Sequence, residues 1–185
     1  MGNNKSQVLA SSAGKVALYG ILGAQALALS FFESYIPQIP GLPPGAKLGF
    51  SNIVTMYAVY SMGLPSAIYI TLLKAGFAFL TRGATAGFMS LSGGILSTLI
   101  MFLLVKFKSK PFGIAGIGIL SAIAHNMGQL IVAIIMAGSL SVLSYAPLLL
   151  IFSVITGLVT GSILKIIIPA LEKQSKFFIN IGKKN

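Results

Sequence analysis

The sequence predicts an all-α integral membrane protein, folded as a bundle of about six transmembrane helices. Hydrophobic residues make up 56% of the 185 residues and charged residues only 8%, and the mean hydropathy is +0.94. A soluble domain carries roughly a quarter charged residues. This chain has far fewer, which argues against a soluble fold. The apolar runs are long and continuous rather than alternating, which favours helices over a β-barrel.

Turn residues divide the apolar sequence into six segments. The first segment ends at IPQIPGLPPGAK, whose prolines and glycines cannot continue a helix. Gly63-Leu64-Pro65 predicts a tight turn, Thr81-Arg82-Gly83 a break, and KFKSKP a polar loop. The second and third segments are short, and they could form one re-entrant hairpin instead of two spans. The expected helices are residues 16–35, 48–62, 65–80, 85–105, 112–137 and 146–168.

We divide the chain into a cytoplasmic N-terminal tail (1–12), a six-helix membrane domain (13–168) and a basic cytoplasmic C-terminal tail (169–185). An N-terminus in the cytoplasm places most basic residues on that side, as the positive-inside rule requires. Lys47 and Arg82 then lie outside, and Lys74 lies within the third helix. The cytoplasmic set is Lys5, Lys15, Lys106, Lys108, Lys110, Lys165, Lys173, Lys176, Lys183 and Lys184. We therefore predict a multi-pass cell-membrane protein with both termini cytoplasmic.

The net charge of +11 could by itself indicate nucleic acid. Because the lysines sit at helix ends and in the tails, where membrane topology explains them, we expect no nucleic-acid partner.

Small residues recur at intervals of three or four residues along the first helix and again at Gly157 and Gly161 in the last. Such spacing places small side chains on one stripe, where another backbone can approach closely. The stripe could serve ordinary packing inside the bundle or docking of another membrane protein. Its first-helix members are Ala13, Ala17, Gly20, Ala24 and Ala28.

Polar residues inside the apolar segments are the candidate ligand site, because ionisable groups in a bilayer are costly and usually functional. Lys74 lies well short of either end of its helix, where it could bind an anion, reach the headgroups or pair with Glu33. On the fifth helix, His125, Asn126 and Gln129 form one polar stripe. With Asn52, Lys47 and Arg82, they predict a net-positive cavity for a ligand bearing carboxylate, phosphate or carbonyl groups. Glu33 would neutralise Lys47 or Arg82.

Three runs in order resemble the Gx transporter family, also labelled heptaprenyl diphosphate synthase component I. They are PPGAKLGFSNIVTMYAVYSMG (43–63), SLSGGILSTLIM (90–101) and AIAHNMGQLIVA (122–133). That family is similar to the substrate-binding S components of energy-coupling factor (ECF) transporters, six-helix proteins with cytoplasmic termini. The resemblance implies a ligand in the outer half, beneath a lid at residues 37–46. It also implies docking of a membrane coupling subunit, driven by separate ATPases, on Ala13, Ala17, Gly20 and Ala24.

The resulting expectation is a substrate-binding subunit for uptake of a small vitamin- or cofactor-like molecule. Two alternatives stay open: a non-catalytic membrane partner in quinone, isoprenoid or flavin-linked electron transfer, and an accessory subunit of a heptaprenyl diphosphate synthase. A stand-alone synthase needs carboxylates to hold magnesium, and this chain has two acids and no aspartate. We therefore expect no enzyme activity. With no cysteine and one histidine, we expect no metal site and no cofactor.

Overall fold

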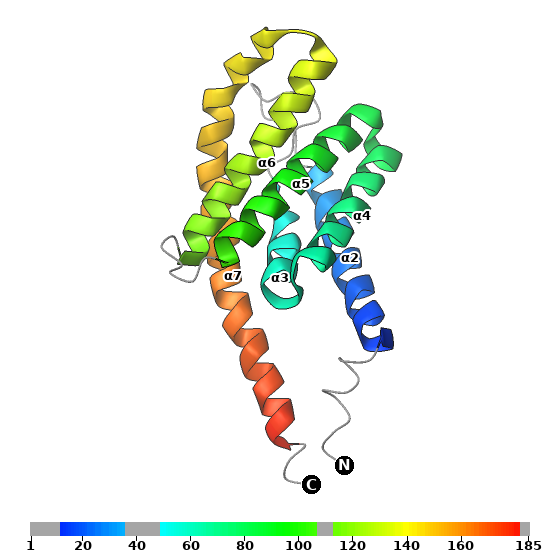
Figure 1. The fold of residues 1–185 in the computed structure, drawn as a ribbon, viewed down its shortest axis with the longest axis vertical. Coiled ribbons are helices and arrows are strands. Elements are labelled where there is room, and N and C mark those ends of the chain that lie inside the picture. Colours follow the sequence, from blue (N-terminus) through cyan, green and yellow to red (C-terminus); the bar gives the residue numbers. More distant parts are fainter. Residues whose placement is uncertain (1–11, 36–48, 107–112, 182–185) are drawn as a thin grey trace.

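The computed structural model describes residues 12–35, 49–106 and 113–181, with side chains described from residue 19 to residue 169 of these ranges. The described residues form six α-helices and one 3₁₀ helix, arranged as a bundle (Figure 1). This confirms the prediction of an all-α membrane bundle. The elements are α2 (Ser12–Ser34), α3 (Asn52–Met62), α4 (Leu64–Arg82), α5 (Ala84–Lys106), α6 (Gly113–Ala137), η1 (Leu140–Tyr145) and α7 (Ala146–Ile181).

Four stretches of the described chain are long and apolar enough to cross a membrane: Leu64–Arg82, Ala84–Lys106, Gly113–Ala137 and Leu140–Pro169. The protein is therefore a multi-pass membrane protein. Helix α3 has 11 residues, which gives a length of about 16 Å, about half the hydrocarbon thickness. The second predicted helix is consequently not a full span, because it begins at Asn52 and is too short.

Glycines at the predicted turns separate α3 from α4 and α4 from α5. Gly63 has φ 86° and Gly83 has φ 87°, a left-handed region in which a residue without a Cβ is favoured. The Gly63 amide donates to the Ala58 carbonyl at 3.0 Å and the Gly83 amide to the Phe79 carbonyl at 3.2 Å. Both predicted breaks are confirmed, and α3, α4 and α5 follow one another with almost no connecting loop.

The C-terminal segment departs from the prediction. We expected the last helix to stop at residue 168 and a tail to follow, but α7 continues through Pro169 to Ile181. A proline removes one backbone donor and kinks a helix, yet the flanking residues can stay helical. The short η1, which the sequence did not predict, lies directly before α7, and its first turn is capped where the Ser141 amide donates to Ser139 Oγ at 3.2 Å.

Glycines bring α5, α6 and α7 into backbone contact. A Cβ on Gly128 would lie 2.7 Å from the Gly93 Cα, and a Cβ on Gly161 would lie 2.7 Å from the Ala115 Cα. A Cβ on Gly118 would overlap the Gly157 carbonyl oxygen. Of the alternatives left open for the small residues, Gly157 and Gly161 therefore serve packing inside the bundle, the role that small residues commonly take between membrane helices.

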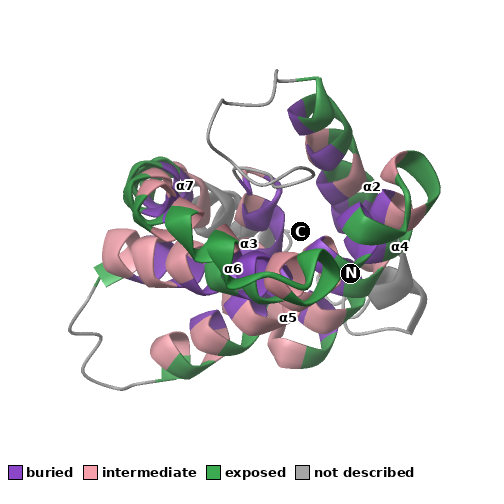
Figure 2. Cartoon of the chain, turned by 90° about the horizontal axis from the view of Figure 1, so that it is seen from above, coloured by how far each residue is buried: buried purple, intermediate pink, exposed green. Residues whose placement is uncertain are grey.

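The residues coloured as buried gather toward the middle of the bundle, while the exposed ones lie mainly on its outside (Figure 2). The apolar core lies toward the end of the molecule where α2 begins and α7 ends (Figure 1). It is built from α2 to α7, with Met56, Ile70, Met101, Ile117 and Leu164 nearly inaccessible. The polar buried residues described next lie beyond this core, toward the other end of the helices.

Candidate ligand site

A polar pocket lies at the end of the bundle away from the start of α2 and the end of α7. The last turns of α2 and α4, the residues before α3, the first turns of α5 and the second half of α6 meet there, because successive helices run in opposite directions (Figure 1). Its lining residues are Ser30, Glu33, Gly49, Ser51, Lys74, Arg82, Ala86, Ser90, His125 and Gln129. Eight of these ten residues, all except Gly49 and Ala86, have polar or charged side chains, so the lining is mostly polar.

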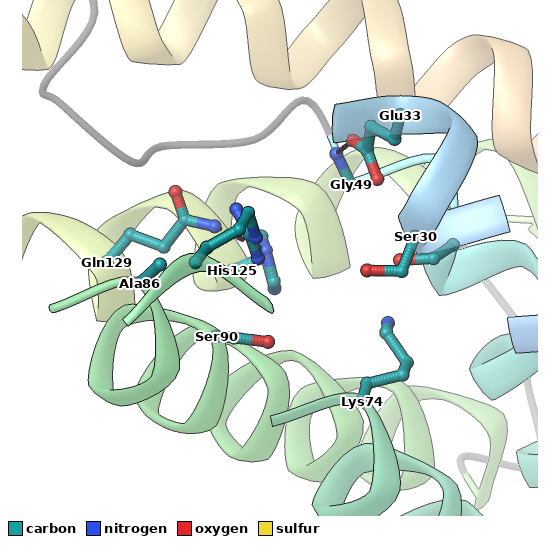
Figure 3. A pocket seen from close by; sticks show the side chains of 10 residues that line it. Ser30, Glu33, Gly49, Lys74, Ala86, Ser90, His125 and Gln129 are labelled. Carbon is teal, nitrogen blue, oxygen red and sulfur yellow. Dashed lines mark hydrogen bonds between the residues drawn. The ribbon is translucent and has the colours of Figure 1, made fainter. Parts of the chain in front are cut away.

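Lys74 lies on the buried face of α4 and is 5% exposed. Its Nζ donates a hydrogen bond to the Asn52 Oδ1 at 2.8 Å, which ties α4 to the first turn of α3. One turn earlier on α4, the Thr71 hydroxyl shares a 2.9 Å hydrogen bond with the hydroxyl of Thr98 on α5. Figure 3 shows the Lys74 side chain reaching into the space between the helices, toward Ser30. Lys74 therefore places a positive charge inside the pocket rather than at a lipid headgroup.

His125 and Gln129 lie one turn apart on α6, and the Gln129 Nε2 and the His125 Nε2 are 2.7 Å apart. Both side chains are at most 5% exposed. The His125 Nδ1 is buried and has no hydrogen-bond partner among the described residues. Helix α5 comes this close to α6 because residue 93 is glycine, where a Cβ would lie 2.6 Å from the His125 carbonyl oxygen.

Glu33 closes the pocket at the C-terminal end of α2 and is 6% exposed. Its Oε1 accepts hydrogen bonds from the backbone amides of Gly49 and Phe50, the latter at 3.2 Å. The carboxylate also interacts electrostatically with Arg82, as the sequence predicted. Its Oε2 is buried and has no hydrogen-bond partner among the described residues. One oxygen of Glu33 thus holds the chain before α3 by hydrogen bonds, and the other is an acceptor without a partner at the pocket.

The backbone three residues before α3 has a conformation that favours glycine. Gly49 has φ 89°, and a Cβ there would lie 2.8 Å from the Asn52 Nδ2. Its position lets two consecutive amides point at the Glu33 carboxylate, a concave arrangement that suits an anionic group.

The structure brings together four of the seven predicted ligand-binding residues: Lys74, Arg82, His125 and Gln129 line the pocket. Asn52 is not a lining residue, but its side-chain oxygen accepts the hydrogen bond from Lys74. Asn126 instead points toward α7, where its Nδ2 donates to the Ser153 Oγ at 2.7 Å and to the Leu149 carbonyl at 3.3 Å. Lys47 lies outside the described residues, as does the expected lid at 37–46.

Six lining residues were absent from the predicted ligand set: Ser30, Glu33, Gly49, Ser51, Ala86 and Ser90. Ser30 and Glu33 lie three residues apart on α2, a spacing that places both side chains on one face. This spacing was visible in the sequence. Ala86 carried no polar signal, because its side chain is a methyl group.

The pocket has the character of a small-molecule site. Two cations, Lys74 and Arg82, line the pocket with one carboxylate, Glu33, so the formal charge of the lining is positive. It encloses about 290 Å³, including the part open to the surroundings. About 10 Å³ of this admits the centre of a water molecule, so side chains must move before an organic ligand fits. Among the described residues, no group of three or more His, Cys, Asp or Glu side chains could hold a metal ion.

The predicted docking stripe lies on α2, away from this pocket. Gly20 and Ala24 are exposed, and a Cβ on Gly20 would meet nothing within 4 Å. Ala13 and Ala17 fall within the helix, but their side chains lie outside the described set.

Comparison with known proteins agrees with the architecture. A solved structure of the S component of a bacterial ECF transporter is similar to this chain, with a TM-score of 0.51 and 20% sequence identity, covering 88% of this chain and 98% of the other. At this identity, the likeness shows the fold. No curated protein matches. The sequence model of the heptaprenyl diphosphate synthase component I family matches residues 22–167, most of the chain, and the protein therefore belongs to the heptaprenyl diphosphate synthase component I family.

Proposed function

We propose that the protein is a substrate-binding membrane subunit, similar in role to an ECF S component, for the uptake of a small vitamin- or cofactor-like molecule. The observation that carries the proposal is the buried polar pocket of an S-component fold, lined by Lys74 from α4 and His125 from α6. A buried ammonium is costly in a membrane protein unless it faces polar groups or a ligand. The net positive lining favours a ligand with anionic or carbonyl groups.

The proposal includes a direction and a partner. With the cytoplasmic termini predicted from the basic residues, the pocket opens outward, because it lies at the opposite end of the bundle. The chain contains no glycine-rich phosphate-binding loop ending in Lys-Ser or Lys-Thr. Energy for uptake would come from separate ATPases through a membrane coupling subunit, and the exposed Gly20 and Ala24 of α2 are the proposed contact.

The family label also suggests a synthase, but the chain has only two acidic residues that could bind magnesium for such a reaction. Transfer of a prenyl diphosphate needs magnesium held by oxygen ligands, normally carboxylates. The two acids of this chain are Glu33, at the pocket, and Glu172, near the end of α7. We infer a non-catalytic role, and an accessory role beside a separate catalytic chain would show as co-purification with that chain.

The test uses protein purified from its own host membranes in lipid nanodiscs and analysed by native mass spectrometry. The wild type should carry a small molecule that is released on unfolding. Lys74→Met should lower its occupancy, whereas Lys106→Met, the same substitution at an exposed end of α5, should not. A wild type that carries no small molecule and gains no thermal stability from any compound in a vitamin and cofactor-precursor library would contradict the proposal.

A further inference from the structure

The Glu33 carboxylate gives the pocket an acceptor that a simple anion cannot use. Its Oε1 is occupied by the amides of Gly49 and Phe50. The Oε2 is buried without a hydrogen-bond partner among the described residues, on a side chain only 6% exposed. A buried acceptor left unsatisfied is unfavourable, and a carboxylate oxygen accepts only from a donor.

The rest of the lining supplies the opposite chemistry. Lys74 and Arg82 are donors with a positive charge, and they lie across the pocket on α4. Figure 3 shows Glu33 at one edge of the space and Lys74 at another, with the Ser30 hydroxyl directed into the space between them. The pocket thus has an accepting edge on α2 and a donating edge on α4.

We infer that the site selects molecules that carry an N–H donor as well as an anionic or carbonyl acceptor, with the N–H donating to the Glu33 Oε2. This inference rests on the proposed function and adds to it a specificity-determining residue. The Glu33 charge already interacts with two amides and with Arg82, so a neutral amide-type N–H satisfies the Oε2 without a second cation. Simple carboxylates, which offer acceptors alone, would leave that oxygen unsatisfied and bind more weakly.

A matched pair of probes tests this inference: pyroglutamate, which has a carboxylate and a lactam N–H, and its lactone analogue, in which a ring oxygen replaces the N–H. Binding to the protein in nanodiscs is measured by calorimetry at millimolar concentrations, the range expected of ligands this small. Pyroglutamate should bind at least about tenfold more tightly than the lactone, because the lactone loses a hydrogen bond to a charged group.

The variant Glu33→Gln sharpens the test. The glutamine oxygen can still accept from Gly49 and Phe50, while the amide nitrogen replaces the free acceptor with a donor. The preference for pyroglutamate should disappear or reverse in this variant. Glu172→Gln removes the same charge from the only other acid in the chain and should leave the preference intact. Thermal unfolding of each variant without probe shows whether it is folded.

The outcomes separate the two proposals. Equal affinity for both probes, an unchanged preference in Glu33→Gln, or no binding of either probe would overturn the inference. If a co-purified small molecule is still present, and Lys74→Met still depletes it, the proposed function stands alone. A co-purified molecule without any N–H group would likewise overturn the inference and leave the function in place. A failed co-purification and library screen contradict the function itself.

Discussion

The Lys74 Nζ and the Asn52 Oδ1 lie 2.8 Å apart, so a buried ammonium on α4 is joined to the first turn of the short helix α3. The contact connects the pocket to a helix that is too short to span the membrane. Lys74 has therefore a structural partner as well as a place in the pocket, and substitutions must separate the two roles.

Lys74→Met should weaken ligand binding, and its effect on stability should be limited, because removing a buried charge offsets part of the loss of its hydrogen bond. The Asn52 oxygen left behind should lower stability by about 1–3 kcal/mol at most. The double variant Lys74→Met with Asn52→Leu should recover that loss without recovering binding. Thermal unfolding and ligand occupancy, measured on the wild type, Lys74→Met and the double variant, check both parts. Full occupancy in Lys74→Met would remove Lys74 from the site.

Asn126 and Gln129 lie three residues apart on α6 and should respond in opposite ways. Asn126 bonds to Ser153 on α7, so Asn126→Ala should lower stability by about 0.5–2 kcal/mol and leave ligand affinity unchanged. Gln129→Ala should weaken binding with a smaller effect on stability. Unfolding curves and binding isotherms of the two variants give the comparison. Reduced affinity in Asn126→Ala would return this residue to the ligand site.

Gly118→Ala should destabilise the protein by about 1–3 kcal/mol, because its Cβ would overlap the Gly157 carbonyl in a contact that only a backbone shift can relieve. Gly76→Ala is the matched control. It is also a helical glycine, but its Cβ would meet nothing within 4 Å, so stability should stay the same or rise by up to about 1 kcal/mol. Thermal melts in one detergent compare them. Equal melting temperatures would show that α6 and α7 are not in backbone contact.

Gly20→Trp should release a coupling partner while leaving the protein folded, since the position is open in the structure. Gly76→Trp, which places the same bulk on an exposed part of α4, should leave the complex intact. The measurement is co-purification of the membrane and ATPase partners from host membranes. Ala17→Trp extends the test to the predicted part of the stripe. Normal recovery of the partners with both α2 variants would argue for plain lipid contact.

The orientation can be read from single cysteines, because the natural chain has none. A cysteine at Gln38 should react with an impermeant reagent on intact cells, and one at Ser109 should react only after lysis. Both sites lie outside the described residues and follow from the distribution of basic side chains. The opposite pattern would invert the topology and place the pocket on the cytoplasmic side.

Helix positions and the turns at Gly63 and Gly83 could be predicted, because glycine and proline interrupt long apolar runs. The short length of α3 could not be predicted, since hydropathy does not distinguish a short buried helix from a membrane span. The last helix was expected to end at residue 168, but α7 continues through Pro169, because a proline need not end a helix. In the site, Lys74, His125 and Gln129 were found as polar residues on apolar helices. The orientation of Asn126 depends on how α6 packs against α7, and the amides that hold Glu33 become adjacent only after folding.

Helix α2 differs from its neighbours in how it is held. It packs mainly against α4, through the close approach of Gly23 to Leu73 and the hydrogen bond that Ser66 donates to Tyr19, and less against α3. Its buried side ends in Ser30 and Glu33, and its exposed side presents Gly20 and Ala24. A helix tilts as one body, so a shift at Glu33 is transmitted about 20 Å along the axis to Gly20. The pocket and the exposed Gly20 and Ala24 are therefore joined by one helix, which is not among the glycine-packed helices α5, α6 and α7.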